Sequence, residues 1–190
     1  MTFLSAPVTL RSFALASVLL LLPAVGMSQT LCRANEVDYF SCVTAPANKI
    51  VSVCGNITKG GIDDDSWLQY RFGRTDAIEL AYPTTKRGSI EKFEGNHFNK
   101  YRVIDLRFVS GKTLYGVELN DAYDGEDAQA RHKPSGGVSV QISKSKSVSI
   151  ECRTVSVSKY YSVFSDLNDS LRAYNGETDF LYHFYNHVSR

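Results

Sequence analysis

Short apolar segments separated by turn residues run through this chain from Val37 to Cys152, and this rhythm constrains the fold more than any other feature. Nothing between the segments has a convincing helical period, so a parallel βαβ sheet is not expected. About eight or nine short strands at hairpin spacing predict an all-β fold, an antiparallel β-barrel or sandwich of about eight strands. The expected strands are Val37–Thr44, Ile50–Cys54, Ser66–Phe72, Ala77–Tyr82, Lys100–Val109, Thr113–Leu119, Gly137–Ile142 and Ser147–Cys152, with a further short strand at Ile90–Phe93.

Alternation of side chains within these segments predicts which residues face the core. Ile104, Leu106 and Phe108 fall on one face of their strand, with charged residues on the other. In the first strand the same alternation places Tyr39 on the face opposite Phe40.

The last thirty or so residues have a different pattern. Apolar residues recur at helical spacing in Ser162–Tyr174 and again in Thr178–Val188, with Gly176 between them. We therefore expect a β domain over residues 29–158 and a helical appendage over 159–190 with one or two short helices. Its many aromatic side chains favour packing against the sheet over a role in binding, although aromatic residues also dominate interface cores.

Residues 1–28 have the pattern of a signal peptide. Ala14–Val25 is an apolar block too short to span a bilayer, Pro23 interrupts it near its end, and small residues follow. Cleavage after Ser28 and cleavage after Gly26 both fit. Two alternatives remain open, an N-terminal membrane anchor and a lipid attached to Cys32.

Removal of the signal changes the charge of the chain. Arg11 is the one charged residue in the signal, so the 21 basic residues become 20, against 20 acidic ones. A charge near zero argues against a dedicated nucleic-acid binder, which normally carries a basic stripe, so no nucleic-acid partner is expected. We expect no membrane span in the mature chain and a periplasmic or secreted location.

The four cysteines are expected to form two disulfides, because an even count in an exported chain is typical of a disulfide framework. Their spacing contains no C-x-x-C and is not that of a zinc site. Of the three connectivities, we predict the nested one. It joins Cys42 to Cys54 within a hairpin and Cys32 to Cys152 between the first strand and a late one.

Three blocks of sequence resemble an uncharacterised family of exported bacterial all-β proteins. They are the FSC…SVC hairpin with its flanks (Leu31–Cys54), QYRFG with the strand that ends in Tyr82-Pro83, and Gly136–Val140 with the strand ending at Cys152. The resemblance covers roughly Leu31 to Cys152. It implies export, disulfides and a β domain, and it carries over no catalytic residue.

A partner-binding loop is predicted at Ser110, Gly111, Lys112 and Tyr115. It resembles the Ser-Gly…Tyr loop of periplasmic lysozyme inhibitors, although the Tyr here falls one residue later. The resemblance implies insertion of the loop into an active-site cleft, where Ser and Lys would meet carboxylates. An ordinary Ser-Gly turn is the simpler interpretation.

Metal and catalytic sites have weaker support. His183 and His187, with Asp179 one turn earlier, could line up three zinc ligands on a helix, but a fourth ligand is not evident. Clustered acidic side chains could bind calcium or act as the paired carboxylates of a glycoside hydrolase, but they match no specific motif for either. These acids are Asp63, Asp64, Asp65, Asp121, Asp124, Glu126 and Asp127, with Glu79 and Glu118 on strands. We expect no metal, no cofactor and no catalytic residue.

The function that these patterns favour is non-enzymatic binding of a protein or other macromolecule in the cell envelope or outside the cell. Its sharpest version is an inhibitor or immunity protein directed against a cell-wall hydrolase. The alternatives are a secreted carbohydrate-active enzyme that uses loop carboxylates and a structural envelope protein. The oligomeric state cannot be predicted from these residues.

Overall fold

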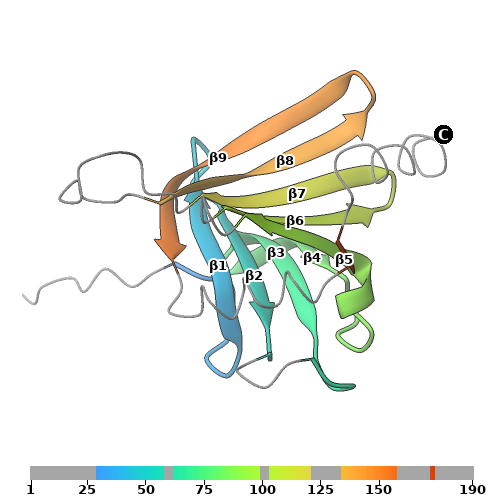
Figure 1. Ribbon diagram of the computed structural model, residues 1–190. Coiled ribbons are helices and arrows are strands. Elements are labelled where there is room, and N and C mark those ends of the chain that lie inside the picture. The colour runs from blue at the N-terminus through green and yellow to red at the C-terminus, as the bar shows by residue number, and fades with distance from the viewer. Residues whose placement is uncertain (1–28, 58–61, 99–102, 121–133, 158–171, 174–190) are drawn as a thin grey trace, which may run out of the picture.

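A computed structural model describes residues 29–57, 62–98, 103–120, 134–157 and 172–173, and in them nine antiparallel strands form one curled sheet, a half-barrel (Figure 1). The expected all-β class is confirmed. The strands are β1 (Val37–Thr44), β2 (Ile50–Gly55), β3 (Leu68–Arg74), β4 (Ala77–Tyr82), β5 (Phe93–Phe98), β6 (Val103–Ser110), β7 (Thr113–Asn120), β8 (Ser135–Ser143) and β9 (Lys146–Val157). A two-residue strand, β10 (Arg172–Ala173), pairs in parallel with β5.

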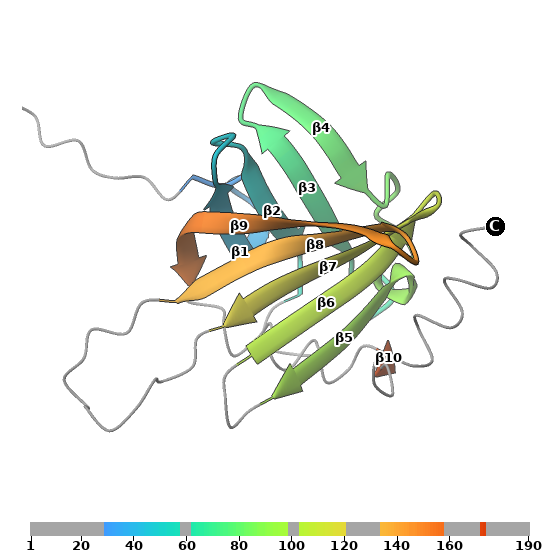
Figure 2. The same ribbon diagram turned by 90° about the horizontal axis from the view of Figure 1, so that it is seen from above.

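The sheet order is β10-β5-β6-β7-β8-β9-β1-β2-β3-β4. The long strand β9 joins the two halves, because its first part pairs with β8 and its last part with β1. Figure 2 shows the β1–β4 half and the β5–β9 half curling toward each other, with β4 outermost on its side. The two edges approach each other at the end of β4, where the rings of Tyr82 and Phe93 lie 6.0 Å apart.

The core fills the concave side of the sheet. The predicted inward residues Ile104, Leu106 and Phe108 are all buried there. Aromatic rings from both halves meet around Phe108, which stacks on Tyr115 at 4.9 Å and on Tyr82 at 4.8 Å. Such contacts add to the free energy gained from apolar burial alone and hold the two halves together.

A β-bulge in β1 changes the predicted facing of Tyr39. Asp38 pairs with Cys54, but Phe40 pairs with Val53, so Tyr39 is an extra residue in the strand. Tyr39 and Phe40 therefore both belong to the core cluster, and the prediction that they lie on opposite faces was wrong. The buried Tyr39 hydroxyl donates to the Ile57 carbonyl at 2.7 Å, which satisfies its polar end.

Two predicted elements differ in the structure. Ile90–Lys92 forms a 3-10 helix instead of a strand, and β5 begins only at Phe93. Arg172 and Ala173, expected in a helix, form β10. The remaining residues of the helical appendage and the whole of the predicted signal lie outside the described residues.

All four cysteines form disulfides, but the predicted pairing was wrong: the bonds are Cys32–Cys54 and Cys42–Cys152. The hairpin register explains the error, because it pairs Cys42 with Val51 rather than with Cys54. Cys42 faces the core beside β9, whereas Cys54 faces outward beneath the segment that precedes β1. Two disulfides indicate an oxidising, exported environment.

No helix among the described residues is long and apolar enough to cross a membrane.

Candidate functional site

The segment before β1, residues 29–36, lies over the outer face of β2 and β3. The Cys32–Cys54 disulfide fastens it to β2, and the Leu31 N–H donates to the Ser52 hydroxyl at 2.9 Å. The outward residues of β3 in this region, Gln69 and Arg71, are buried although they face away from the barrel core. The segment thus supplies one wall of a site whose floor is the outer face of the sheet.

Arg71 is held by an ion pair with Glu36. Its Nη1 lies 2.6 Å from Glu36 Oε2 and its Nη2 lies 2.9 Å from Oε1, a bidentate arrangement. The side chains are only 4% and 2% exposed, respectively. Arg71 also donates to the Leu31 carbonyl and to the Gln69 side chain. These bonds fix the guanidinium in one orientation.

The pKa of Glu36 reflects this setting. Burial alone would raise it, but hydrogen bonds from Arg71, from the backbone N–H of Arg33 and from Lys86, together with the Arg71 charge, outweigh burial and lower it to about 2. Glu36 is therefore ionised at neutral pH and balances one of the positive charges around it.

Lys86 enters the same site from the loop after β4. Its Nζ lies 3.0 Å from Glu36 Oε1 and 3.6 Å from the centre of the Trp67 ring. The Lys86 side chain is 42% exposed, so its ammonium group is both positioned and accessible to solvent.

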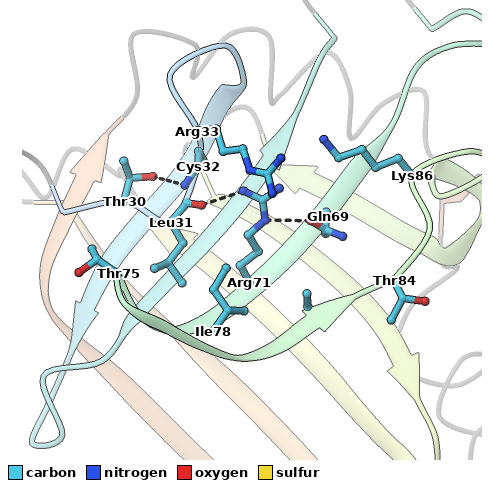
Figure 3. Close-up of a pocket in the computed structure, with 11 residues that line it drawn as sticks. Thr30, Leu31, Cys32, Arg33, Gln69, Arg71, Thr75, Ile78, Thr84 and Lys86 are labelled. Carbon is cyan, nitrogen blue, oxygen red and sulfur yellow. Dashed lines mark hydrogen bonds between the residues drawn. The ribbon is translucent and has the colours of Figure 1, made fainter.

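These groups line a groove of about 530 Å³, which we call the basic groove (Figure 3). Arg33 and Lys86 reach toward Arg71 from different sides. Leu31, Ile78 and Ala81 form an apolar part of the lining. The lining residues are Thr30, Leu31, Cys32, Arg33, Gln69, Arg71, Thr75, Ile78, Ala81, Thr84 and Lys86. Among the described residues, three cations and the carboxylate of Glu36 meet at the groove, which gives this part of the surface a positive charge.

A small hydroxyl cluster lies beside the segment. The Ser41 hydroxyl donates to Asp38 Oδ1 at 2.8 Å and lies 2.8 Å from the Ser52 hydroxyl. Burial raises the pKa of Asp38, and hydrogen bonds from Ser41 and Thr30 offset part of that rise. The cluster links β1, β2 and the segment, so it supports the wall of the basic groove.

The predicted partner-binding loop is a tight hairpin between β6 and β7. Ser110 pairs with Thr113, which leaves Gly111 and Lys112 exposed at the tip. Gly111 has a φ of +62°, a left-handed conformation that favours glycine. Tyr115 is not at the tip, because its ring stacks on Phe108 inside the half-barrel.

Glu118 lies on a second hollow, on the outer face of β6–β9, with a volume of about 410 Å³. The register places Asp105, Glu118, Gly137 and Glu151 in one row across the four strands. Arg107 lies beside the row and contacts Asp105 at 2.9 Å. This face of the sheet is therefore acidic, in contrast to the basic groove.

The other predicted acids are not brought together with Glu118. Glu79 pairs with Lys49 at 2.6 Å, and Asp63 accepts from the Ser66 hydroxyl within a turn that also contains Asp64 and Asp65. No group of three metal-ligating side chains occurs in the part of the chain that the structure describes. Several predicted residues lie outside that part: Asp121, Asp124, Glu126, Asp127, Asp179, His183 and His187.

Sequence reasoning missed the basic groove. Arg71 occupies a position where alternation predicts an outward, solvated side chain, and Glu36 stands before the first strand. A charged residue within the buried run LQYRF was a signal that some partner must cover it, since unpaired buried charge is costly. Its partner, 35 residues earlier in the chain, could not be read from spacing.

Comparison with known proteins returns no matching family model, no matching curated protein and no matching solved structure. The resemblances described above therefore stay predictions.

Proposed function

We propose that this chain is an exported, non-enzymatic binding protein that recognises a macromolecular partner in the cell envelope or outside the cell. The observation that carries the proposal is the fixed geometry of the basic groove. Arg71 is held by three acceptors, Lys86 is held against Trp67, and a disulfide holds the wall. Groups that are already ordered lose little conformational entropy when they bind, so such a site suits recognition.

The finer proposal is inhibition of a cell-wall hydrolase, as in the lysozyme inhibitors that the Ser110–Tyr115 loop resembles. Gly111 and Lys112 are exposed at a hairpin tip, which is a shape that can enter a cleft. Hydrolase clefts of this kind carry paired carboxylates. Lys112 would supply a positive charge to such a pair.

An enzyme that acts on carbohydrate is the second candidate, and the row of acids on the outer face of β6–β9 favours it. Glu118 and Glu151 flank Gly137, two strand spacings apart, which is roughly 10 Å between their backbones. That spacing is close to the carboxylate separation of inverting glycosidases, roughly 6.5–9.5 Å.

One set of assays separates these candidates. Purified protein, with its disulfides intact, is immobilised and exposed to an envelope extract, and in parallel it is added to a lysozyme reaction on cell-wall substrate. Retention of a specific protein or slower wall hydrolysis is expected. Lys112→Ala should relieve inhibition, whereas Lys144→Ala, on another hairpin tip, should not.

Two results would overturn the binding proposal. If nothing is retained and lysozyme is unaffected, the recognition function fails. If the protein itself cleaves the wall substrate and Glu118→Gln abolishes the cleavage, the enzyme is the correct interpretation.

A further inference from the structure

We propose that the basic groove binds an extended, acidic peptide segment of the partner protein, which adds to β4, the last of the described strands in the sheet order, and places a carboxylate between Arg33 and Lys86. This inference rests on the proposed binding function and names the chemistry of the partner.

The charge of the groove points to an anion. Arg33, Arg71 and Lys86 line it, and Glu36 is the one carboxylate within hydrogen-bonding distance of Arg71 and Lys86 among the described residues. Arg71 and Glu36 neutralise each other's charge in a bidentate contact. Arg33 and the half-exposed Lys86 are then the cations that an incoming carboxylate would meet, and both can donate charge-assisted hydrogen bonds.

The position of the groove points to a peptide. Among the described strands β4 pairs only with β3, and Figure 2 shows it as the outermost strand of its half. The residues Ala77–Glu79 are exposed. An exposed edge strand offers main-chain N–H and C=O groups in the pattern that an added strand requires.

The register connects this edge to the cations. Ala81 pairs with Arg71 across β4 and β3, and both line the groove on the outer face. A strand added beside β4 would place alternate side chains on the same outer face. Because Ala81 has a small side chain, an acidic side chain opposite it has room to cross β4 toward Lys86 and Arg33.

An anionic polymer is a weaker fit than a peptide. Polyanions bind along extended basic stripes, which release many counterions. The three cations of the groove lie close together rather than along a stripe, and the outer face of β6–β9 carries Asp105, Glu118 and Glu151, which would repel a polyanion. A polymer without amide groups also could not form the alternating N–H and C=O hydrogen bonds that an added strand makes with β4.

The experiment titrates the full mature protein with an eight-residue peptide of alternating Glu and Val, blocked at both ends, and follows the fluorescence of Trp67. Trp67 is the one tryptophan of the chain, and it contacts Lys86 directly. Three other probes are compared: the peptide with every Glu replaced by Gln, the peptide with alternate backbone nitrogens methylated, and inorganic polyphosphate. Isothermal titration calorimetry checks each affinity.

The expected result is binding of the Glu peptide, weakened at least tenfold by the Gln replacement and at least tenfold by backbone methylation. Arg33→Ala should weaken binding about tenfold, the loss of a charge-assisted contact. Arg87→Ala is the matched control, an exposed arginine next to Lys86 in sequence but outside the groove lining, and should bind as wild type does.

Equal binding of the Glu and Gln peptides would overturn the charge role of the groove. If the methylated peptide binds as tightly as the unmethylated Glu peptide, strand addition at β4 is overturned. If polyphosphate binds more tightly than the Glu peptide, the groove is a polyanion site. The immobilised Arg33→Ala variant is also exposed to the envelope extract. If it retains an envelope protein as well as the wild type does, the binding function stands but the groove is not its site.

Discussion

Replacement of Glu36 by glutamine tests the physical argument for the basic groove most directly. Glu36→Gln keeps the shape of the side chain but leaves the guanidinium of Arg71, 4% exposed, without its counter-charge. Removal of one partner of a buried ion pair costs about 3–5 kcal/mol, because the other charge stays buried and unpaired. Glutamine still offers one oxygen to Arg71, so we expect the lower end, a loss of about 3 kcal/mol in the free energy of unfolding.

The pKa of Glu36 gives a second value, which includes the contacts with Lys86 and the Arg33 N–H as well as those with Arg71. Its pKa falls from 4.5 to about 2 on folding. At about 1.4 kcal/mol per pKa unit, this difference corresponds to roughly 3.5 kcal/mol, within the range expected for the buried pair. Because the folded pKa is the lower one, the stabilisation is complete above about pH 4.5 and is lost as pH falls from there toward 2. The variant should lack this acid-dependent loss of stability.

The assay is urea unfolding at a series of pH values, with both disulfides oxidised and Trp67 fluorescence as the signal. Glu79→Gln is the matched control, because Glu79 pairs with Lys49 at 2.6 Å but is 44% exposed. An exposed pair contributes roughly 0–1 kcal/mol. Adding Arg71→Met to Glu36→Gln should restore part of the lost stability, since it removes the unpaired charge.

Two outcomes would refute this reasoning. The first is a Glu36→Gln variant that loses no more stability than Glu79→Gln does. The second is a Glu36→Gln variant whose free energy of unfolding still falls between pH 4.5 and 2 by as much as that of the wild type. Protonation of other carboxylates would then cause the fall.

Two further predictions concern the covalent and backbone constraints of the fold. Replacement of Cys42 and Cys152 by serine should reduce the free energy of unfolding by about 1.5 kcal/mol more than replacement of Cys32 and Cys54, because the bonds close loops of 110 and 22 residues. Urea unfolding of the two double variants measures this, and mass mapping of unreduced peptides that found Cys42 joined to Cys54 would contradict the connectivity. At the β6–β7 tip, Gly111→Val should cost roughly 1–2 kcal/mol, because a left-handed backbone strains a branched residue, and Gly111→Asn should cost clearly less. Equal costs measured by urea unfolding would show that the φ of Gly111 does not matter.

Most strands of this chain are predictable from local sequence because alternation and turn residues are local properties, but β5 is not, since only Phe93 of it was expected in a strand. The predicted bounds of β1 and β4 match the structure residue for residue, and Ile104, Leu106 and Phe108 face the core as expected. The short element at Ile90–Lys92 was not predictable in this way, since three residues give too little pattern to separate a strand from a turn of helix.

The sequence by itself determined the all-β class, the disulfide-bonded state of four cysteines and the inward face of β6. Only the tertiary structure decided which cysteines pair, because the pairing follows from hairpin register and from the meeting of β1 with β9, more than 100 residues later in the chain. The same holds for the basic groove. Glu36, Arg71 and Lys86 come from three separate parts of the chain, and their charges meet only because a disulfide-held segment folds over the outer face of the sheet.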